Sequence, residues 1–126
     1  MSKHEKVNIL MVDDQPSKLL TYEVMLAELG ENLIKANSGR EALELLLKND
    51  VAVVLMDVSM PEMDGFELAE MIRQKSALRR LPIIALTAKA MKGDREKCLE
   101  AGASEYLAKP VNTDQLLSAL RTWLHR

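Results

Sequence analysis

The stretch Val51-Ala-Val-Val-Leu-Met-Asp57-Val-Ser-Met-Pro-Glu-Met-Asp-Gly65 contains the pattern that decides the fold. Six apolar residues lead directly to Asp57, and proline, aspartate and glycine follow within eight residues. A short, β-branched apolar run closed by turn residues is typical of a strand that is buried on both faces, as in a parallel sheet. Asp57 then lies at the carboxyl end of a central strand, where open α/β sheets bind their ligands. The alternative is an aspartate that only caps the following turn.

The composition excludes several classes of function. The 126 residues are 48% hydrophobic and 29% charged, which fits one domain with one core, expected at about residues 7–124. A net charge of -2 and 3% aromatic residues give no basis for binding nucleic acid or an anionic membrane. One cysteine, Cys98, with His4 and His125 far away in the chain, does not suit a disulfide framework, a zinc site or a Cys-His nucleophile. Because neither a membrane span nor a signal peptide is apparent, we expect a cytoplasmic protein.

Strand and helix signals alternate along the chain. We expect strands at 7–12, 33–36, 51–57, 83–87 and 105–108. We expect helices over 17–29, from 38 to 49, from 64, over 94–101 and from 112. Ser38, Asp64 and Asn112 are predicted N-caps because Glu or Gln follows each three residues later, and Gly30 and Gly102 are predicted helix stops. The alternation predicts a parallel α/β sheet with five strands, five helices covering both faces, and right-handed crossovers.

Apolar residues at helical spacing predict which face of each helix packs on the sheet. These faces are Leu20, Val24 and Ala27 in the first helix; Ala42, Leu43, Leu46 and Leu47 in the second; Leu68, Ala69 and Ile72 in the third; and Leu116, Leu117, Leu120, Trp123 and Leu124 in the last. We interpret the basic segment with Lys75, Arg79 and Arg80 as a solvated loop rather than a docking patch.

Polar side chains follow the carboxyl ends of four of the five expected strands. They are Asp13 and Asp14, then Asp57, Thr87 and Lys109. Carboxylates that converge in a small space need raised pKa values or a cation, and Mg2+ commonly binds one or two carboxylates together with phosphate oxygens. A lysine and a hydroxyl on the same rim suit the remaining oxygens of a phosphoryl group. The alternative is that Lys109 only neutralises the acidic cluster as a structural ion pair.

Four groups of residues, in order along the chain, resemble a response-regulator receiver domain of two-component signalling. They are Met11-Val-Asp-Asp14; Leu55-Met-Asp57-Val-Ser-Met-Pro61 with Asp64-Gly65; Ile84-Ala-Leu-Thr87-Ala88; and Ala101-Gly-Ala with Tyr106-Leu-Ala-Lys109-Pro110. The resemblance extends from about residue 7 to 124. It implies a flavodoxin-like, doubly wound sheet with strand order 2-1-3-4-5.

The resemblance also implies a chemistry for each strand end. Asp57 is the expected phosphoacceptor, which takes the phosphoryl group from a phosphohistidine on a histidine kinase or histidine phosphotransfer domain. Asp14, Asp57 and the backbone carbonyl of Ser59 are expected to bind Mg2+, and Asp13 to act mostly through water. Such a protein is a signalling phosphoacceptor that assists its own phosphorylation and dephosphorylation, and is not an enzyme in the usual sense.

Further roles come from the same resemblance. Lys109 would pair with a phosphoryl oxygen, Thr87 would swing to bond another, and Tyr106 would turn inward as Thr87 moves. Ordinary half-burial on an edge strand is the alternative for Tyr106. The peptide bond between Lys109 and Pro110 would be cis. The fourth helix, fifth strand and fifth helix would form the face that signals to a partner.

Three other functions fit the sequence less well. A phosphatase with a strand-end aspartate nucleophile usually has a second aspartate two residues later, where this chain has Ser59. A flavin- or nucleotide-binding module needs a phosphate cradle after its first strand, where this chain has Asp13-Asp14-Gln15-Pro16. A degenerate receiver would lack one of the acidic, threonine or lysine positions. The segment 86–98 resembles receivers of hybrid sensor kinases, so we favour a receiver attached to such a kinase over a stand-alone regulator, as a monomer or weak dimer.

Overall fold

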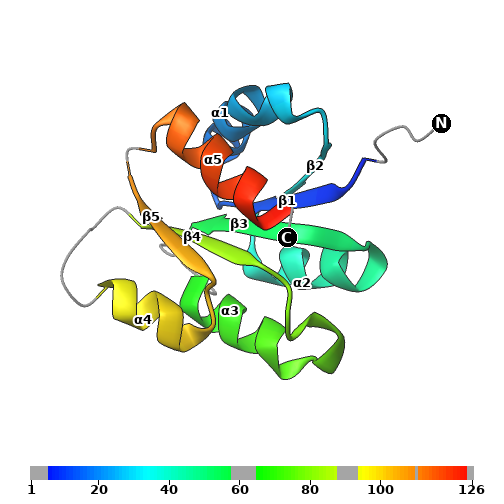
Figure 1. The fold of residues 1–126 in the computed structure, drawn as a ribbon. Helices are drawn as coiled ribbons and strands as arrows, with labels where there is room; N and C mark the ends of the chain where they lie inside the picture. Colours follow the sequence, from blue (N-terminus) through cyan, green and yellow to red (C-terminus); the bar gives the residue numbers. More distant parts are fainter. Residues whose placement is uncertain (1–5, 58–64, 88–93, 110, 125–126) are drawn as a thin grey trace.

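A computed structural model describes residues 6–57, 65–87, 94–109 and 111–124, in which strands and helices alternate (Figure 1). The strands are β1 (Asn8–Val12), β2 (Asn32–Ala36), β3 (Val51–Asp57), β4 (Ile83–Thr87) and β5 (Glu105–Ala108). The α-helices are α1 (Pro16–Leu26), α2 (Gly39–Lys48), α3 (Gly65–Gln74), α4 (Asp94–Ala101) and α5 (Thr113–Leu124). Two short 3-10 turns, η1 (Ala27–Leu29) and η2 (Ser76–Leu78), follow α1 and α3.

The described strands form one parallel sheet in the order β2-β1-β3-β4-β5. This confirms the predicted five-stranded, flavodoxin-like topology. The switch point of such a sheet lies between β1 and β3, which pair directly. Because all five strands run in the same direction, their carboxyl ends, including Asp57, lie at one edge of the sheet.

The helices cover the sheet in two layers, with α1 and α5 on one face and α2, α3 and α4 on the other (Figure 1). Side chains alternate along each strand between the two faces. In β3, for example, Val53 and Leu55 pack in the cluster under α1 and α5, whereas Val54 and Met56 pack in the cluster under the other three helices. The sheet is therefore buried on both sides, as its apolar runs predict.

The predicted helix ends are confirmed where the structure describes them. Ser38 Oγ accepts the N–H of Glu41 at 3.1 Å, and the Glu41 carboxylate accepts a backbone N–H at 2.6 Å from Asn37. Asn112 Oδ1 accepts the N–H of the residue three positions later at 3.1 Å. Gly30 and Gly102 both have positive φ, at 70° and 116°. The third predicted N-cap, at position 64, lies outside the described residues.

The predicted inner face of α1 is wrong. Leu20 and Val24 are 59% and 72% exposed, and the residues that α1 buries are Leu19, Tyr22 and Leu26. The helix carries apolar residues on two faces, and the face that contacts β1 and α5 lies one or two positions before the predicted one along the chain. In α2, Leu47 is likewise 67% exposed, while the other three residues of its predicted face are buried or half-buried.

Candidate functional site

The carboxylate of Asp57 forms an ion pair with Lys109 at the carboxyl edge of the sheet. Their Oδ2 and Nζ atoms are 2.8 Å apart, and the two side chains are only 4% and 16% exposed. The backbone holds this pair in place, because the N–H of Lys109 donates to the carbonyl of Thr87 at 2.7 Å, one position beyond the end of β5. The ion pair joins the end of the central strand β3 to the end of the edge strand β5, and β4 lies between these two strands.

Two further carboxylates lie beside this pair. One carboxylate oxygen from each of Asp13, Asp14 and Asp57 lies within 4.8 Å of the others. Asp13 is fully buried, and its Oδ1 accepts the backbone N–H of Gln15 at 3.0 Å. Its Oδ2 is also buried and has no hydrogen-bond partner among the described residues.

Burial raises the pKa of the Asp13 carboxyl above its ordinary value, and the charge of Asp57 raises it further. The hydrogen bond from Gln15 acts in the opposite direction but does not cancel these effects. The charges of Lys109 and Lys18 also act to lower this pKa, but three carboxylates against these two cations leave the cluster with a surplus of negative charge. An unpartnered carboxylate oxygen among closely spaced carboxylates is a donor set that fits a hard divalent cation such as Mg2+.

Thr87 and Tyr106 lie on the face of the sheet that α2, α3 and α4 cover. Asp57 lies two residues after Leu55, which is on the opposite face. Ile83 and Ala85 of β4 pack under α2, α3 and α4, so the two-residue period directs Thr87 toward the same face. Tyr106 packs, half-buried, against that cluster too, opposite Ala85 in the β4–β5 register. The two residues therefore share a layer, whereas Asp57 follows Leu55, which faces α1 and α5.

The structure also shows contributors that the sequence did not indicate. The backbone N–H of Gln15 is one, because main-chain donors leave no mark in a sequence. Tyr22 is another: it is 7% exposed on α1, and burial together with the charges of Asp13 and Asp57 raises the pKa of its hydroxyl. Two predictions, the backbone carbonyl of Ser59 as a ligand and a cis peptide bond before Pro110, fall outside the described residues.

The arrangement can be compared with known proteins. The family model for the response regulator receiver domain matches residues 9–121 of the chain. The chain belongs to the response regulator receiver domain family. The resemblance inferred from the four residue groups is thus confirmed, and the protein is a receiver domain of two-component or phosphorelay signalling.

Several curated relatives of this receiver domain are sensor kinases. It is 38% identical to the sensor histidine kinase RcsC of Escherichia coli over 126 residues, which are 100% of this chain and 13% of that protein. It is also 38% identical to the signal transduction histidine-protein kinase BarA of Shigella flexneri over 114 residues, or 90% of this chain and 12% of that protein. The receiver therefore spans 12–13% of the length of these two relatives.

Solved structures agree with the fold. The receiver domain of the sensor histidine kinase PA1611 from Pseudomonas aeruginosa, with a magnesium ion in its active site cleft, is 38% identical with a TM-score of 0.88, covering 97% of this chain and 100% of that chain. The chemotaxis protein CheY4 of Vibrio cholerae is 32% identical with a TM-score of 0.89, covering 95% and 100%. In the described part of the receiver, no helix has the length and apolar content needed to span a membrane.

Proposed function

We propose that Asp57 accepts a phosphoryl group from a phosphohistidine of a partner protein. The observation that supports this most directly is the position of the Asp57 carboxylate: it ends the central strand, contacts Lys109 at 2.8 Å, and lies beside a buried carboxylate oxygen that has no partner in the described chain. Receiver family membership supports the same assignment. The turn-capping alternative for Asp57 does not account for the ion pair.

The proposed step exchanges one bond for another. An Asp57 carboxylate oxygen forms a bond to phosphorus while the P–N bond to the histidine breaks, and the electron pair of that bond stays on the imidazole nitrogen. Phosphoryl transfer depends mainly on alignment and on neutralising charge, so the protein needs no further covalent chemistry. Lys109 would neutralise part of the negative charge on the phosphoryl group. Its ammonium group contacts Asp57 Oδ2 and can donate a hydrogen bond to a phosphoryl oxygen bound at Asp57.

The residues proposed to hold Mg2+ are Asp14 and Asp57 directly, Asp13 mostly through water, and the backbone carbonyl of Ser59. The three carboxylates that the structure brings together and the unpartnered Asp13 oxygen support this set. When bound, Mg2+ would neutralise the carboxylates and the phosphoryl oxygens that approach them. A magnesium ion in the cleft of the PA1611 receiver is consistent with the proposal.

Thr87 and Tyr106 are the proposed switch residues. An aspartyl phosphate adds negative charge and acceptor oxygens at the end of β3, and Thr87 would move to bond one of them. Thr87 and Tyr106 lie on the same face of neighbouring strands, which supports the proposal that movement of Thr87 would open or close space for the Tyr106 side chain. The proposed signalling face is α4, β5 and α5. The half-buried position of Tyr106 also fits the alternative of simple packing on an edge strand.

The proposed partner is a histidine kinase or a histidine phosphotransfer domain, and the similarity to receivers within RcsC and BarA favours a hybrid kinase as the setting. In that setting the chain is one receiver domain that acts as a phosphoacceptor rather than as an enzyme with turnover of a free substrate. A monomer or weak dimer, the lack of nucleic-acid binding and a cytoplasmic location stay predictions from the sequence.

Intact-mass measurement after incubation with acetyl phosphate tests this function. We expect one added phosphoryl group on the wild type in the presence of Mg2+, and none with EDTA or on Asp57→Asn. Asp50→Asn is the matched control, because Asp50 is exposed just before the same strand and its phosphorylation should equal that of the wild type. An adduct on Asp57→Asn, or none on the wild type with Mg2+, would contradict the proposal.

A further inference from the structure

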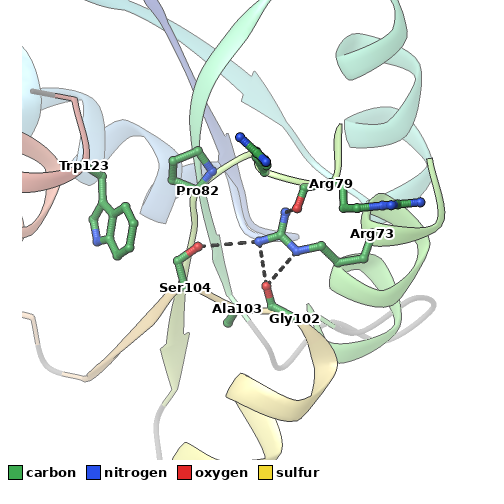
Figure 2. A pocket seen from close by; sticks show the side chains of 8 residues that line it. Arg73, Arg79, Pro82, Gly102, Ala103, Ser104 and Trp123 are labelled. Carbon is green, nitrogen blue, oxygen red and sulfur yellow. Dashed lines mark hydrogen bonds between the residues drawn. The ribbon is translucent and has the colours of Figure 1, made fainter. Parts of the chain in front are cut away.

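A pocket of about 690 Å3 lies at the amino edge of the sheet, away from the acidic cluster. Its walls come from Pro82, which precedes β4, from Gly102 to Ser104, which precede β5, and from Trp123 of α5 (Figure 2). Because the strands are parallel, this edge is opposite the one that carries Asp57. The pocket volume lies within the range of roughly 300–1,000 Å3 that is usual for small-molecule sites.

Arg73 of α3 brings a half-buried positive charge to this pocket. Its Nε and Nη2 donate to the carbonyl of Gly102 at 2.9 and 2.7 Å, and Nη2 also reaches Ser104 Oγ at 3.5 Å (Figure 2). Its Nη1 donates to three more carbonyls, those of Leu78, Arg79 and Leu81, at 3.1, 3.1 and 2.7 Å. These acceptors are all neutral, so the guanidinium is held firmly but its charge is not compensated by a carboxylate in the described chain. Burial lowers the pKa of the Arg73 side chain.

Arg79 and Arg80 also line the pocket, so two more cationic residues lie at it. Both side chains are exposed, and neither forms an ion pair with a described residue. The eight residues that line the pocket include these three arginines and no aspartate or glutamate. Glu105 lies just beyond the walls, where its carboxylate accepts the indole N–H of Trp123 at 2.7 Å. The pocket is therefore a concentration of positive charge in a chain whose net charge is -2.

The remaining walls supply a hydroxyl donor and apolar surface. Ser104 Oγ accepts the N–H of Ile83 at 3.0 Å, and its own hydrogen has no acceptor among the described residues. Pro82, Ala103 and the indole of Trp123 give an apolar and aromatic side to the pocket. The bond to Glu105 fixes the indole, so a ligand that contacts it does not have to order the ring.

We propose that this pocket binds a nucleoside phosphate. The exposed guanidinium groups of Arg79 and Arg80 would bind the phosphates through charge-assisted hydrogen bonds, with the fixed charge of Arg73 behind them. The base would lie on the apolar side, next to Trp123. The sequence alone indicates that the two arginines belong to a solvated basic loop. The structure instead shows them lining a pocket together with the Ser104 hydroxyl and the Trp123 indole. The site does not depend on the proposed phosphorylation of Asp57.

Fluorescence of Trp123, the only tryptophan of the chain, is a local probe of the pocket. ADP is titrated into the Asp57→Asn protein in EDTA, so that neither phosphorylation nor a magnesium–nucleotide complex at the acidic edge contributes. We expect a saturable change in emission with ADP, a weaker response to pyrophosphate and none to adenosine. The apparent affinity should fall as salt is added, because exposed charges are screened. Calorimetric titration provides a dissociation constant that does not depend on the fluorophore.

The double variant Arg79→Ala/Arg80→Ala should bind ADP about tenfold to hundredfold more weakly, the loss expected for one charge-assisted bond. Both side chains are exposed, and Arg73 bonds only the backbone carbonyl of Arg79, so the variant should fold normally. Arg40→Ala, which removes an exposed arginine of α2 outside the pocket, should bind like the parent. No saturable binding, equal binding by the double variant, or displacement of ADP by short oligoglutamate with higher affinity than ADP itself would overturn the proposal.

Discussion

Replacing Asp13 with asparagine should stabilise the metal-free protein. Asp13 is fully buried, and one of its two oxygens has no hydrogen-bond partner in the described chain. Leaving such a group unsatisfied costs about 1–3 kcal/mol. Asparagine retains an oxygen for the N–H of Gln15 and replaces the unpartnered oxygen with an amide that can donate to a neighbouring carboxylate within the 4.8 Å cluster. The expected gain is therefore about 1–3 kcal/mol, or roughly 4 °C in Tm for each kcal/mol.

The pH dependence of this gain has a definite sign. Burial raises the pKa of the Asp13 carboxyl above its ordinary value of 3.8. The folded protein therefore favours the neutral form of this carboxyl. The stability gained from protonating it is fully present below about pH 4 and is lost as the pH rises through the raised pKa. The asparagine substitution brings little benefit at low pH, because the wild-type carboxyl is already neutral there. The difference in unfolding free energy between Asp13→Asn and the wild type should therefore grow from pH 4 toward neutral pH.

Urea denaturation in EDTA and in Mg2+ measures both effects. At ten times its dissociation constant, Mg2+ should stabilise the wild type by about 1.4 kcal/mol, and it should stabilise Asp13→Asn less. Asp50→Asn, an exposed substitution of the same kind, should change the unfolding free energy by less than about 0.5 kcal/mol. The reasoning is refuted if Asp13→Asn is no more stable than the wild type in EDTA near neutral pH.

Three further predictions concern the fold and are checked by urea denaturation. Gly102→Ala should lower the unfolding free energy by about 1–3 kcal/mol, because φ is 116° and a Cβ would lie 2.7 Å from the Arg73 side chain. Gly30→Ala, at φ 70° with open space around it, should lower the unfolding free energy less, and equal losses would contradict the steric argument. Ser38→Ala should cost about 0.5–2 kcal/mol through the lost bond to the N–H of Glu41, and an unchanged urea midpoint would show that the cap is not needed. Leu20→Gln should change stability by less than about 0.5 kcal/mol, whereas Leu19→Ala should cost about 2–5 kcal/mol; the reverse ranking would support the inner face of α1 that the spacing predicts.

The strands could be predicted well because their signals are local. Each expected strand ends at, or is directly followed by, a polar or charged residue, and the observed strands differ from the expected ones by at most one residue at either end. The inner face of α1 could not be predicted in the same way. Leu19, Tyr22 and Leu26 follow helical spacing as well as Leu20 and Val24 do, and only contacts with β1 and α5 decide between the two stripes.

The carboxyl-edge cluster followed from the rule that parallel strands end at one edge, and the structure does bring Asp13, Asp14, Asp57 and Lys109 together there. Arg73 could not be found in this way. Its partners are backbone carbonyls near positions 78–81 and 102, and carbonyl groups are common to every residue type. The pairing of Trp123 with Glu105 was hidden for a related reason, since eighteen positions separate them and neither lies in a recognisable motif.

The ion pair between Asp57 and Lys109 links the centre of the sheet to its edge. β5 is a four-residue edge strand, the type of element that frays first. If the hydrogen bond from the Lys109 N–H to the Thr87 carbonyl breaks as β5 frays, Lys109 moves away from the Asp57 carboxylate. That carboxylate is only 4% exposed, so the loss of the ion pair with Lys109 is costly. We therefore expect the exchange rate of the Lys109 backbone amide hydrogen to depend on the charge at position 57. A change of charge at the end of the central strand would then be measurable as a change in amide exchange at the edge strand.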